Sequence, residues 1–200
     1  MHIFQAKQPL AWGQLDLPLL GLSRDWDGNA IDPPAAFSLA DDGRHLWFVA
    51  HHRSPASIHP TATPGRFMPE LWQYDCAELF LGDPASGRYL EFNLAPNSAW
   101  WSCEFTAPRS RAEEIDIAMP DVATFAELTA DGAWLVAMAI PTDLLRARLN
   151  YGSTSTANVT FILGSPNQKF ISAANMGDGP LDFHQPEKFP TVSFTPIPSM

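Results

Sequence analysis

Hydrophobic and polar residues alternate along much of this chain, in short runs separated by Gly, Pro, Asn, Asp and Ser residues. Such runs are typical of β-strands joined by tight turns. The clearest example is the stretch 71–105, in which the pattern predicts three strands: Cys76–Leu81, Arg88–Leu94 and Ala99–Phe105. Residues 82–87 and 95–98 between them have the composition of turns, because such residues supply the backbone angles that reverse a chain.

The rest of the chain follows the same pattern, with a single helix. Pro141 precedes this helix, which is predicted over Thr142–Leu149, because proline fits a first helical turn. The strand before it, 133–140, is apolar on both sides and is therefore predicted to be central and covered on each face. The other predicted strands are Ala35–Leu39, His45–His51, Ile115–Ile117, Ala123–Leu128, Val159–Gly164, Phe170–Ala173 and Thr191–Thr195. Many strands and one short helix predict a single all-β domain over residues 1–200, an antiparallel two-sheet β-sandwich of the jelly-roll kind.

Composition and charge narrow the classes of function. Of the 200 residues 46% are hydrophobic, which is enough for a core, and the formal net charge is −10. An acidic chain is a poor partner for nucleic acid or for an anionic membrane surface, so we expect neither. No apolar run approaches the roughly eighteen residues of a membrane helix. The first residues do not have the pattern of a signal peptide, so a cytoplasmic location is expected.

The second hairpin of the central stretch sorts its side chains onto two faces. If residues 95–98 form the loop, Leu94 pairs with Ala99, and alternate residues of each strand share a face. One face is then predicted to be core and carries Leu90, Phe92, Leu94, Ala99, Trp101, Cys103 and Phe105. The other is polar with aromatic rings and carries Tyr89, Glu91, Asn93, Trp100, Ser102 and Glu104. Glu78 of the preceding strand joins the polar face, which resembles a surface that binds a hydroxyl-rich ligand.

The two cysteines fall on different faces in this arrangement. Cys76 shares the face of Glu78, whereas Cys103 lies on the core face. Two cysteines on opposite faces of a sheet cannot form a disulfide, so both are predicted to be free thiols.

The motifs of the central stretch resemble a known family. They read L-W-x-x-x-C-x-E-x-F-L, then Y-x-E-F-N-x-A-P, then W-x-x-x-x-F, at Leu71, Trp72, Cys76, Glu78, Phe80, Leu81, Tyr89, Glu91, Phe92, Asn93, Ala95, Pro96, Trp100 and Phe105. In these motifs the chain is similar to DOMON-like domains related to family 9 carbohydrate-binding modules, which often place an arginine where Arg109 follows. It departs from them at Ser98, where a turn glycine is usual, and at Trp101, where a small residue is usual. The resemblance implies a β-sandwich that binds its ligand without catalysis.

Sugar recognition requires flat aromatic rings that stack on a pyranose, and planar polar groups that each hold two neighbouring hydroxyls. The candidate ligand-binding residues are Arg66, Trp72, Glu78, Glu91, Asn93, Trp100 and Arg109. The alternative is a buried structural network, in which Glu78 and Glu91 pair with Arg66 or Arg109. Burying two carboxylates without cations would cost several kcal/mol, so arginine partners are expected in either case.

No cofactor is predicted, and no spaced pattern of Cys and His predicts a metal site. The resemblance implies one exception, a structural calcium, for which Asp178 and Asp182 are candidates. The alternative for these two residues is that they are solvated loop carboxylates. The partner expected is a small sugar-like molecule, and the oligomeric state is left open.

Two other functions are also considered. Glu78 and Glu91 on adjacent strands would suit a glycosidase, which needs two carboxyl groups about 5–10 Å apart. The polar face would also suit an interaction with another protein. The function favoured by the sequence is non-catalytic binding of a carbohydrate or another small polyhydroxylated ligand.

Overall fold

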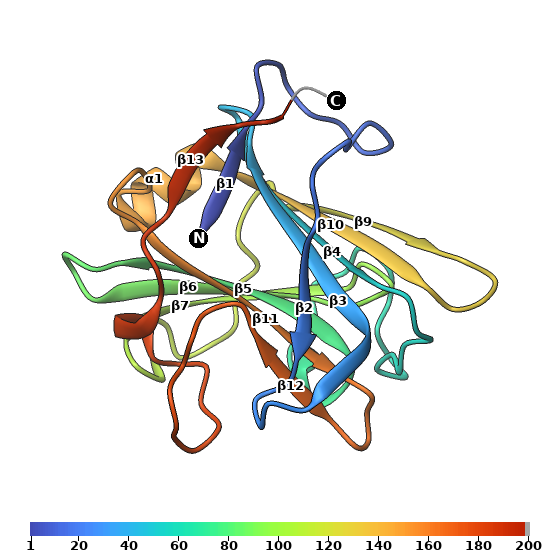
Figure 1. Cartoon of the computed structure of the whole chain (residues 1–200). Coiled ribbons are helices and arrows are strands. Elements are labelled where there is room, and N and C mark those ends of the chain that lie inside the picture. Colours follow the sequence, from blue (N-terminus) through green and yellow to red (C-terminus); the bar gives the residue numbers. More distant parts are fainter. Residues whose placement is uncertain (199–200) are drawn as a thin grey trace.

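Two β-sheets packed against each other form the body of the protein (Figure 1). The computed structural model describes residues 1–198. A seven-stranded sheet contains β1 (His2–Gln5), β2 (Leu20–Arg24), β3 (Ala30–Asp41), β4 (His45–His52), β9 (Ala123–Leu128), β10 (Trp134–Pro141) and β13 (Ser193–Pro196). A six-stranded sheet contains β5 (Cys76–Asp83), β6 (Arg88–Leu94), β7 (Trp100–Ala107), β8 (Ser110–Arg111), β11 (Thr156–Leu163) and β12 (Lys169–Ser172).

The strand order confirms the predicted all-β sandwich. The six-stranded sheet has the order β12-β11-β5-β6-β7-β8, and all its neighbouring strands are antiparallel. The other sheet has the order β13-β1-β3-β4-β10-β9, with β2 also pairing with β3. Here β1 runs parallel to both β3 and β13, which the sequence did not predict.

One helix, α1 (Thr142–Leu149), has the predicted bounds and begins directly after Pro141. It ends at Asn150, which adopts the left-handed conformation common at helix ends. The helix contacts β10 and β6, so it covers one end of the sandwich. Two short 3-10 turns, Leu71–Gln73 and Pro186–Lys188, complete the regular elements of residues 1–198.

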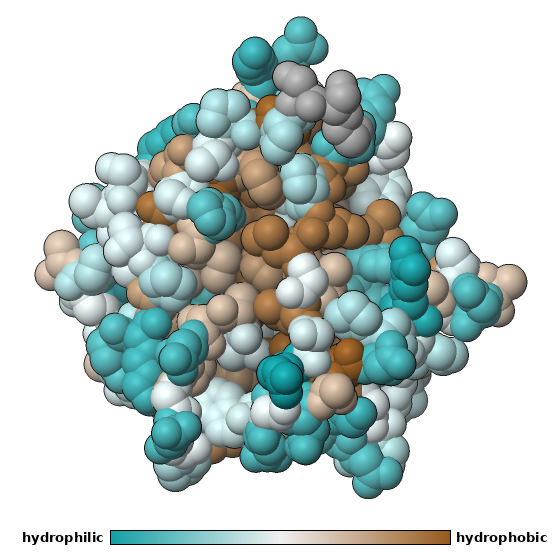
Figure 2. All heavy atoms as spheres, in the orientation of Figure 1, coloured by the Kyte–Doolittle hydropathy of each residue, from teal (hydrophilic) through white to brown (hydrophobic). Residues whose placement is uncertain are grey.

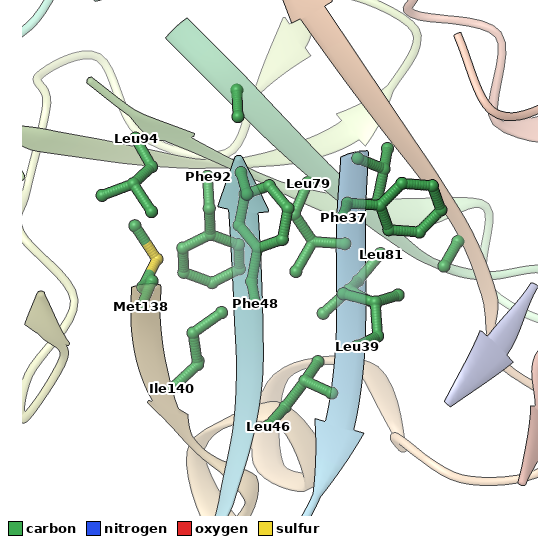
Figure 3. Packing of buried hydrophobic residues seen from close by; sticks show 14 of the residues in the cluster. Phe37, Leu39, Leu46, Phe48, Leu79, Leu81, Phe92, Leu94, Met138 and Ile140 are labelled. Atoms are coloured by element: carbon green, nitrogen blue, oxygen red, sulfur yellow. The ribbon is translucent and has the colours of Figure 1, made fainter. Parts of the chain in front are cut away.

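Apolar side chains from the inner faces of both sheets form the main core (Figure 3). Figure 3 shows them pointing toward one another from the two sheets: Phe37, Leu39, Leu46, Phe48, Leu79, Leu81, Phe92, Leu94, Met138 and Ile140. They alternate along their strands because successive side chains point to opposite faces. Burial of each large apolar side chain stabilises the fold by about 1.5–3 kcal/mol.

The strand β10 is covered on both faces, as its sequence predicted. Trp134 and Met138 lie in the main core, whereas Ala137 and Ala139 face a second apolar cluster on the outside of the sheet. That cluster includes Trp12 of the N-terminal segment, whose ring stacks on Phe125 with centroids 5.4 Å apart. The N-terminal segment therefore covers a sheet face that would otherwise be exposed.

The register predicted for the β6–β7 hairpin is wrong by one residue. Leu94 pairs with Trp100 rather than with Ala99, so the loop contains five residues instead of four. Ala99 is the added residue of the loop, and Ser98 before it has a φ of 68° in the left-handed region. Since side chains alternate, a slip of one residue moves every side chain of β7 to the other face. Trp100 therefore lies in the main core, and Trp101 lies on the outer face of the sheet.

Some other predicted elements differ. Ile115–Ile117 is not a strand; it lies in the loop after β8, and the Ile115 side chain is 71% exposed. Its alternation of apolar residues has no neighbouring strand to pair with. The sequence missed β1, β2 and β8, which are short and defined by their pairing partners rather than by an apolar pattern of their own.

The surface is mixed in character. On the face seen in Figure 2, apolar residues gather toward the middle and hydrophilic residues surround them. Within residues 1–198, no helix has the length and apolar character needed to span a lipid bilayer.

The two-sided core predicts the cost of a cavity at its centre. Phe92→Ala is expected to lower the free energy of unfolding by about 3–5 kcal/mol, because Phe92 is fully buried between the sheets. Leu128→Ala is the control, since Leu128 is exposed on β9, and it should change that free energy by less than about 0.5 kcal/mol. Urea denaturation measures both, and equal effects of the two variants would contradict this description of the core.

Candidate functional site

A cavity of about 700 Å³ lies on the outer face of the six-stranded sheet. Its floor consists of side chains from β5, β6, β7, β11 and β12, and its walls come from residues 69–72, 109–116 and 181–184. This volume is in the range of sites for small molecules, about 300–1,000 Å³. The cavity therefore has the size and position of a ligand site.

Two carboxyl groups lie at the floor. Glu78 pairs across the strands with Asn93, and Glu91 pairs with Phe80, so the two glutamates are diagonal neighbours on the same face. Both are buried, with exposed fractions of 3% for Glu78 and 5% for Glu91. Glu78 accepts a hydrogen bond of 2.6 Å from the Thr160 hydroxyl on β11.

The arginine partners expected for these carboxyl groups do not form. Within residues 1–198, neither glutamate makes an ion pair with an arginine or lysine. The Arg109 guanidinium instead binds Asp182 at 2.8 Å. Arg66 is exposed, and its backbone carbonyl accepts a hydrogen bond from the backbone N–H of Trp100. The predicted structural network of Glu78 and Glu91 with an arginine is therefore wrong.

Protonation compensates for the missing cations. Burial raises the pKa of Glu78 to about 7, although the Thr160 hydroxyl opposes this shift. Burial, and then the nearby Glu78 charge, raise the pKa of Glu91 well above its usual value. Two interacting carboxyl groups titrate as a pair, so the floor keeps at least one proton near neutral pH. It therefore presents a neutral carboxylic acid, which can donate as well as accept hydrogen bonds.

His184 stands beside Glu91 at the end of a hydrogen-bond chain. The backbone N–H of Arg109 donates to the Tyr89 hydroxyl at 3.1 Å, and this hydroxyl forms a hydrogen bond of 2.8 Å with Nδ1 of His184. The other ring nitrogen, Nε2, lies 3.7 Å from Oε2 of Glu91, beyond hydrogen-bond distance. Burial and the Arg109 charge lower the pKa of His184 to about 4, so the ring is neutral.

Aromatic rings hold His184 in place. Its ring packs edge-on against Phe105 at 5.1 Å and against Phe80 at 5.6 Å, measured between centroids. The backbone N–H of His184 also donates to the Asp182 carboxylate at 2.9 Å, which fixes the loop that carries it. These contacts explain the burial that keeps the imidazole neutral.

Two tryptophans line the cavity. Trp72 lies on the 3-10 turn Leu71–Gln73 at the rim and is 51% exposed. Trp101 on β7 is only 6% exposed, and its indole N–H has no hydrogen-bond partner. The Arg111 guanidinium lies over the Trp101 ring at 5.4 Å and binds Asp116 at 2.7 Å. The cavity thus combines an accessible ring at its rim with a buried ring in its floor.

The structure brings four of the seven predicted site residues to the cavity: Trp72, Glu78, Glu91 and Arg109. Asn93 lies on the same face, buried between Glu78 and Trp101 in the strand pairing. Its amide lowers the pKa of Glu91, yet neither amide atom has a hydrogen-bond partner of normal length. Arg66 and Trp100 do not line the cavity.

Sequence reasoning missed Trp101, Arg111 and His184, which line the cavity. Trp101 was assigned to the core because of the register error. The adjacent pair Trp100-Trp101 did carry a signal, because one of two neighbouring strand residues must face the side of Glu91 in either register. No local pattern pointed to His184, which reaches the site through the tertiary fold.

Both cysteines are free thiols on the outer face of the six-stranded sheet. The face predicted for Cys103 is therefore wrong, again because of the register. Cys76 and Cys103 lie on β5 and β7 with β6 between them, and two strand spacings of about 4.8 Å exceed the reach of a disulfide.

The predicted calcium ligands do not gather into a cluster. Asp178 is exposed, and Asp182 already binds Arg109 and the His184 backbone. Among residues 1–198, no group of three or more His, Cys, Asp or Glu side chains has the geometry to hold a metal ion. A structural calcium stays a prediction from the resemblance.

Comparisons with known proteins place the fold. No family model matches the chain, and no curated protein sequence matches it, so the DOMON-like resemblance stays a prediction. Solved structures are similar, among them a protein from Bacteroides uniformis ATCC 8492 classed as a candidate carbohydrate-binding protein. That comparison has a TM-score of 0.73 at 17% identity and covers 97% of this chain and 98% of that one.

A family 9 carbohydrate-binding module from Caldicellulosiruptor kristjanssonii is also similar. Its complex with glucose gives a TM-score of 0.63 at 14% identity and covers 100% of this chain and 97% of that one. Its complex with cellotriose gives 0.65 at 13% identity and covers 98% and 94%. At these identities the likeness is one of fold: the chain has the β-sandwich architecture seen in family 9 carbohydrate-binding modules.

Proposed function

We propose that the protein binds a carbohydrate, without catalysis, in the cavity on the outer face of the six-stranded sheet. The observation that carries this proposal is the combination in one 700 Å³ cavity of two tryptophans with two buried carboxyl groups that lack a cation partner. Rings that stack on a sugar and groups that exchange hydrogen bonds with hydroxyls are the two requirements of sugar binding.

Each part of the cavity has a role in this proposal. Trp72 at the rim offers a face on which a pyranose ring can stack. Glu78 and Glu91 at the floor exchange hydrogen bonds with hydroxyls, and Nε2 of His184 adds a further hydrogen-bonding atom beside them. Arg109 at the opening offers its outward guanidinium nitrogens to a further hydroxyl.

The comparisons support the proposal through their ligands. One similar fold was solved in complexes with glucose and with cellotriose, and another is classed as a candidate carbohydrate-binding protein. They do not name a ligand for this chain, so glucose and cellotriose serve here as first probes.

We also propose that the domain is of the DOMON-like type that its motifs resemble.

A glycosidase is the second candidate, because the floor carries two neighbouring carboxyl groups with raised pKa values. One would act as general acid and the other as base or nucleophile. Turnover of chromogenic glycosides that is lost in Glu91→Gln would establish this activity. No turnover on a broad panel, together with sugar binding, would favour the non-catalytic function.

Substitution of the ring at the rim tests its role in stacking. Trp72→Ala is expected to weaken binding of cellotriose by up to about tenfold, because a lost aromatic contact is worth roughly 0.5–1.5 kcal/mol and a tenfold change in affinity corresponds to about 1.4 kcal/mol. Isothermal titration calorimetry measures the change.

Trp12→Ala is the matched control, since Trp12 packs on the outside of the other sheet and does not line the cavity. Its affinity for cellotriose should equal that of the wild type. No binding of glucose, cellotriose or other sugars by the wild type, or equal affinities in wild type and Trp72→Ala, would contradict the proposal.

The buried Glu78 carboxyl group makes the stability of the fold depend on pH. The folded-state pKa of Glu78, about 7, exceeds its ordinary value of 4.5, so this group costs nothing below about pH 4.5. The free energy of unfolding should fall as the pH rises from about 4.5 to about 7, by up to about 3 kcal/mol, because the unfolded state loses its proton first. Glu78→Gln should therefore raise the free energy of unfolding at about pH 8 while it weakens cellotriose binding, as expected of a carboxyl group kept for function.

Glu104→Gln is the control, and it is expected to lower the free energy of unfolding. The Glu104 carboxylate is also buried, but it binds the guanidinium groups of Arg88 and Arg148. Removing one member of a buried charge network is destabilising. Denaturation at about pH 5 and pH 8 compares the two variants; a Glu78→Gln protein less stable than wild type at pH 8 would contradict the account of this carboxyl group.

A further inference from the structure

We propose that the cavity takes an amino sugar, with the ammonium group of the ligand bound at the floor between Glu78 and Glu91. This inference rests on the proposed carbohydrate-binding function and narrows it to a class of ligand. It follows from which charges face the cavity, which of them are already paired, and which polar atoms have no partner.

The charges around the cavity leave the floor without a cation. Both arginines of the wall are already held by acidic side chains, Arg109 by Asp182 at 2.8 Å and Arg111 by Asp116 at 2.7 Å. Each of these pairs is neutral overall. The buried acids of the site that remain uncompensated are therefore the two floor carboxyl groups; Glu70, which also lines the cavity, is exposed to solvent.

The other titratable groups of this face add no positive charge. Burial raises the pKa of Tyr89 to about 12 and that of Cys103 to about 12, and it raises the pKa of Cys76 well above its ordinary value. These three groups are neutral near pH 7. His184 is neutral as well, since burial and the Arg109 charge lower its pKa to about 4. A cation at the floor must therefore come from the ligand.

The floor has hydrogen-bonding capacity that the protein does not use. Glu91 is nearly fully buried and lines the cavity, yet its contact with His184 is too long for a hydrogen bond. The indole N–H of Trp101 and the amide of Asn93 are buried beside it without partners. Buried polar groups are usually paired, so such a group of unpaired atoms next to a cavity points to a bound molecule.

An ammonium group fits this floor better than a hydroxyl does. It has three donors and no acceptor, and hydrogen bonds between an ammonium and a carboxylate are stronger than those between neutral groups. A buried carboxylate also gains most from a cation, because its charge is otherwise uncompensated. The hydroxyls of the same ligand would reach His184 and the rim, where Trp72 offers its ring.

The same carboxyl groups discriminate against acidic sugars. A uronate or a sugar phosphate would bring its negative charge to a floor that has no cation to pair with it, and an unpaired charge is costly to bury. The expected order of affinity is therefore glucosamine, then glucose, then glucuronate.

Calorimetric titration of the whole chain with glucosamine, N-acetylglucosamine and glucose tests the inference. At about pH 6.5 glucosamine should bind about tenfold more tightly than glucose, because a charged hydrogen bond replaces a neutral one. N-acetylglucosamine, whose amide nitrogen carries no charge, should lose this advantage. Glucosamine should also release up to about one proton per molecule bound, measured in two buffers of different ionisation enthalpy, since the cation favours the ionised carboxyl pair.

Glu91→Gln is the test variant, because it keeps the size of the side chain and removes its acid. The ratio of the glucosamine affinity to the glucose affinity should fall to about one in this variant. Glu127→Gln is the matched control: Glu127 is exposed on β9, in the other sheet, so the ratio should not change.

The outcomes separate this inference from the proposed function. Equal affinities for glucosamine and glucose, or an unchanged ratio in Glu91→Gln, would overturn the amino-sugar inference and leave carbohydrate binding intact. Failure of all three sugars and of cellotriose to bind would overturn both. Tighter binding of glucosamine with proton release, lost in Glu91→Gln, would establish the inference.

Discussion

The pairing of β6 with β7 is the constraint on which the rest of the site depends. Because side chains alternate along a strand, this register decides which residues reach the outer face of the six-stranded sheet. With Leu94 opposite Trp100, Trp100 lies in the main core between the sheets, and Trp101 lines the cavity. A shift of one residue would exchange them and would place Cys103 and Phe105 in the interior.

The second constraint is electrostatic. A sheet that buries Glu78 and Glu91 on one face without a cation is less stable than it would be with neutral side chains there, and protonation reduces this cost without removing it. Glu104 shows the contrast within the same sheet, since two arginines hold its carboxylate. The chain therefore pairs a buried carboxyl group where it serves the fold, and leaves two unpaired where a cavity adjoins them.

Much of the fold could be predicted from local pattern. The bounds of β6, β9 and α1, the two-sheet architecture and the common face of Glu78 and Glu91 all follow from alternation and turn residues. The β6–β7 register could not be predicted, since it depends on a loop in which Ser98 adopts the left-handed conformation. Serine has no particular preference for that conformation, so the residue type did not indicate it. His184 and the pairing of Arg109 with Asp182 could not be predicted either, because they depend on how a distant loop packs over the sheet.

The most direct test of the central claim, that a carbohydrate occupies this cavity, is an NMR titration that follows the indole N–H signals of the seven tryptophans. With cellotriose, the signals of Trp72 and Trp101 should shift together and saturate, because these rings line the cavity. Trp47 lies on β4 of the seven-stranded sheet, and its indole N–H donates to Asp42; its signal should stay in place. Shifts confined to tryptophans outside the cavity, or no shifts with any sugar, would contradict the account.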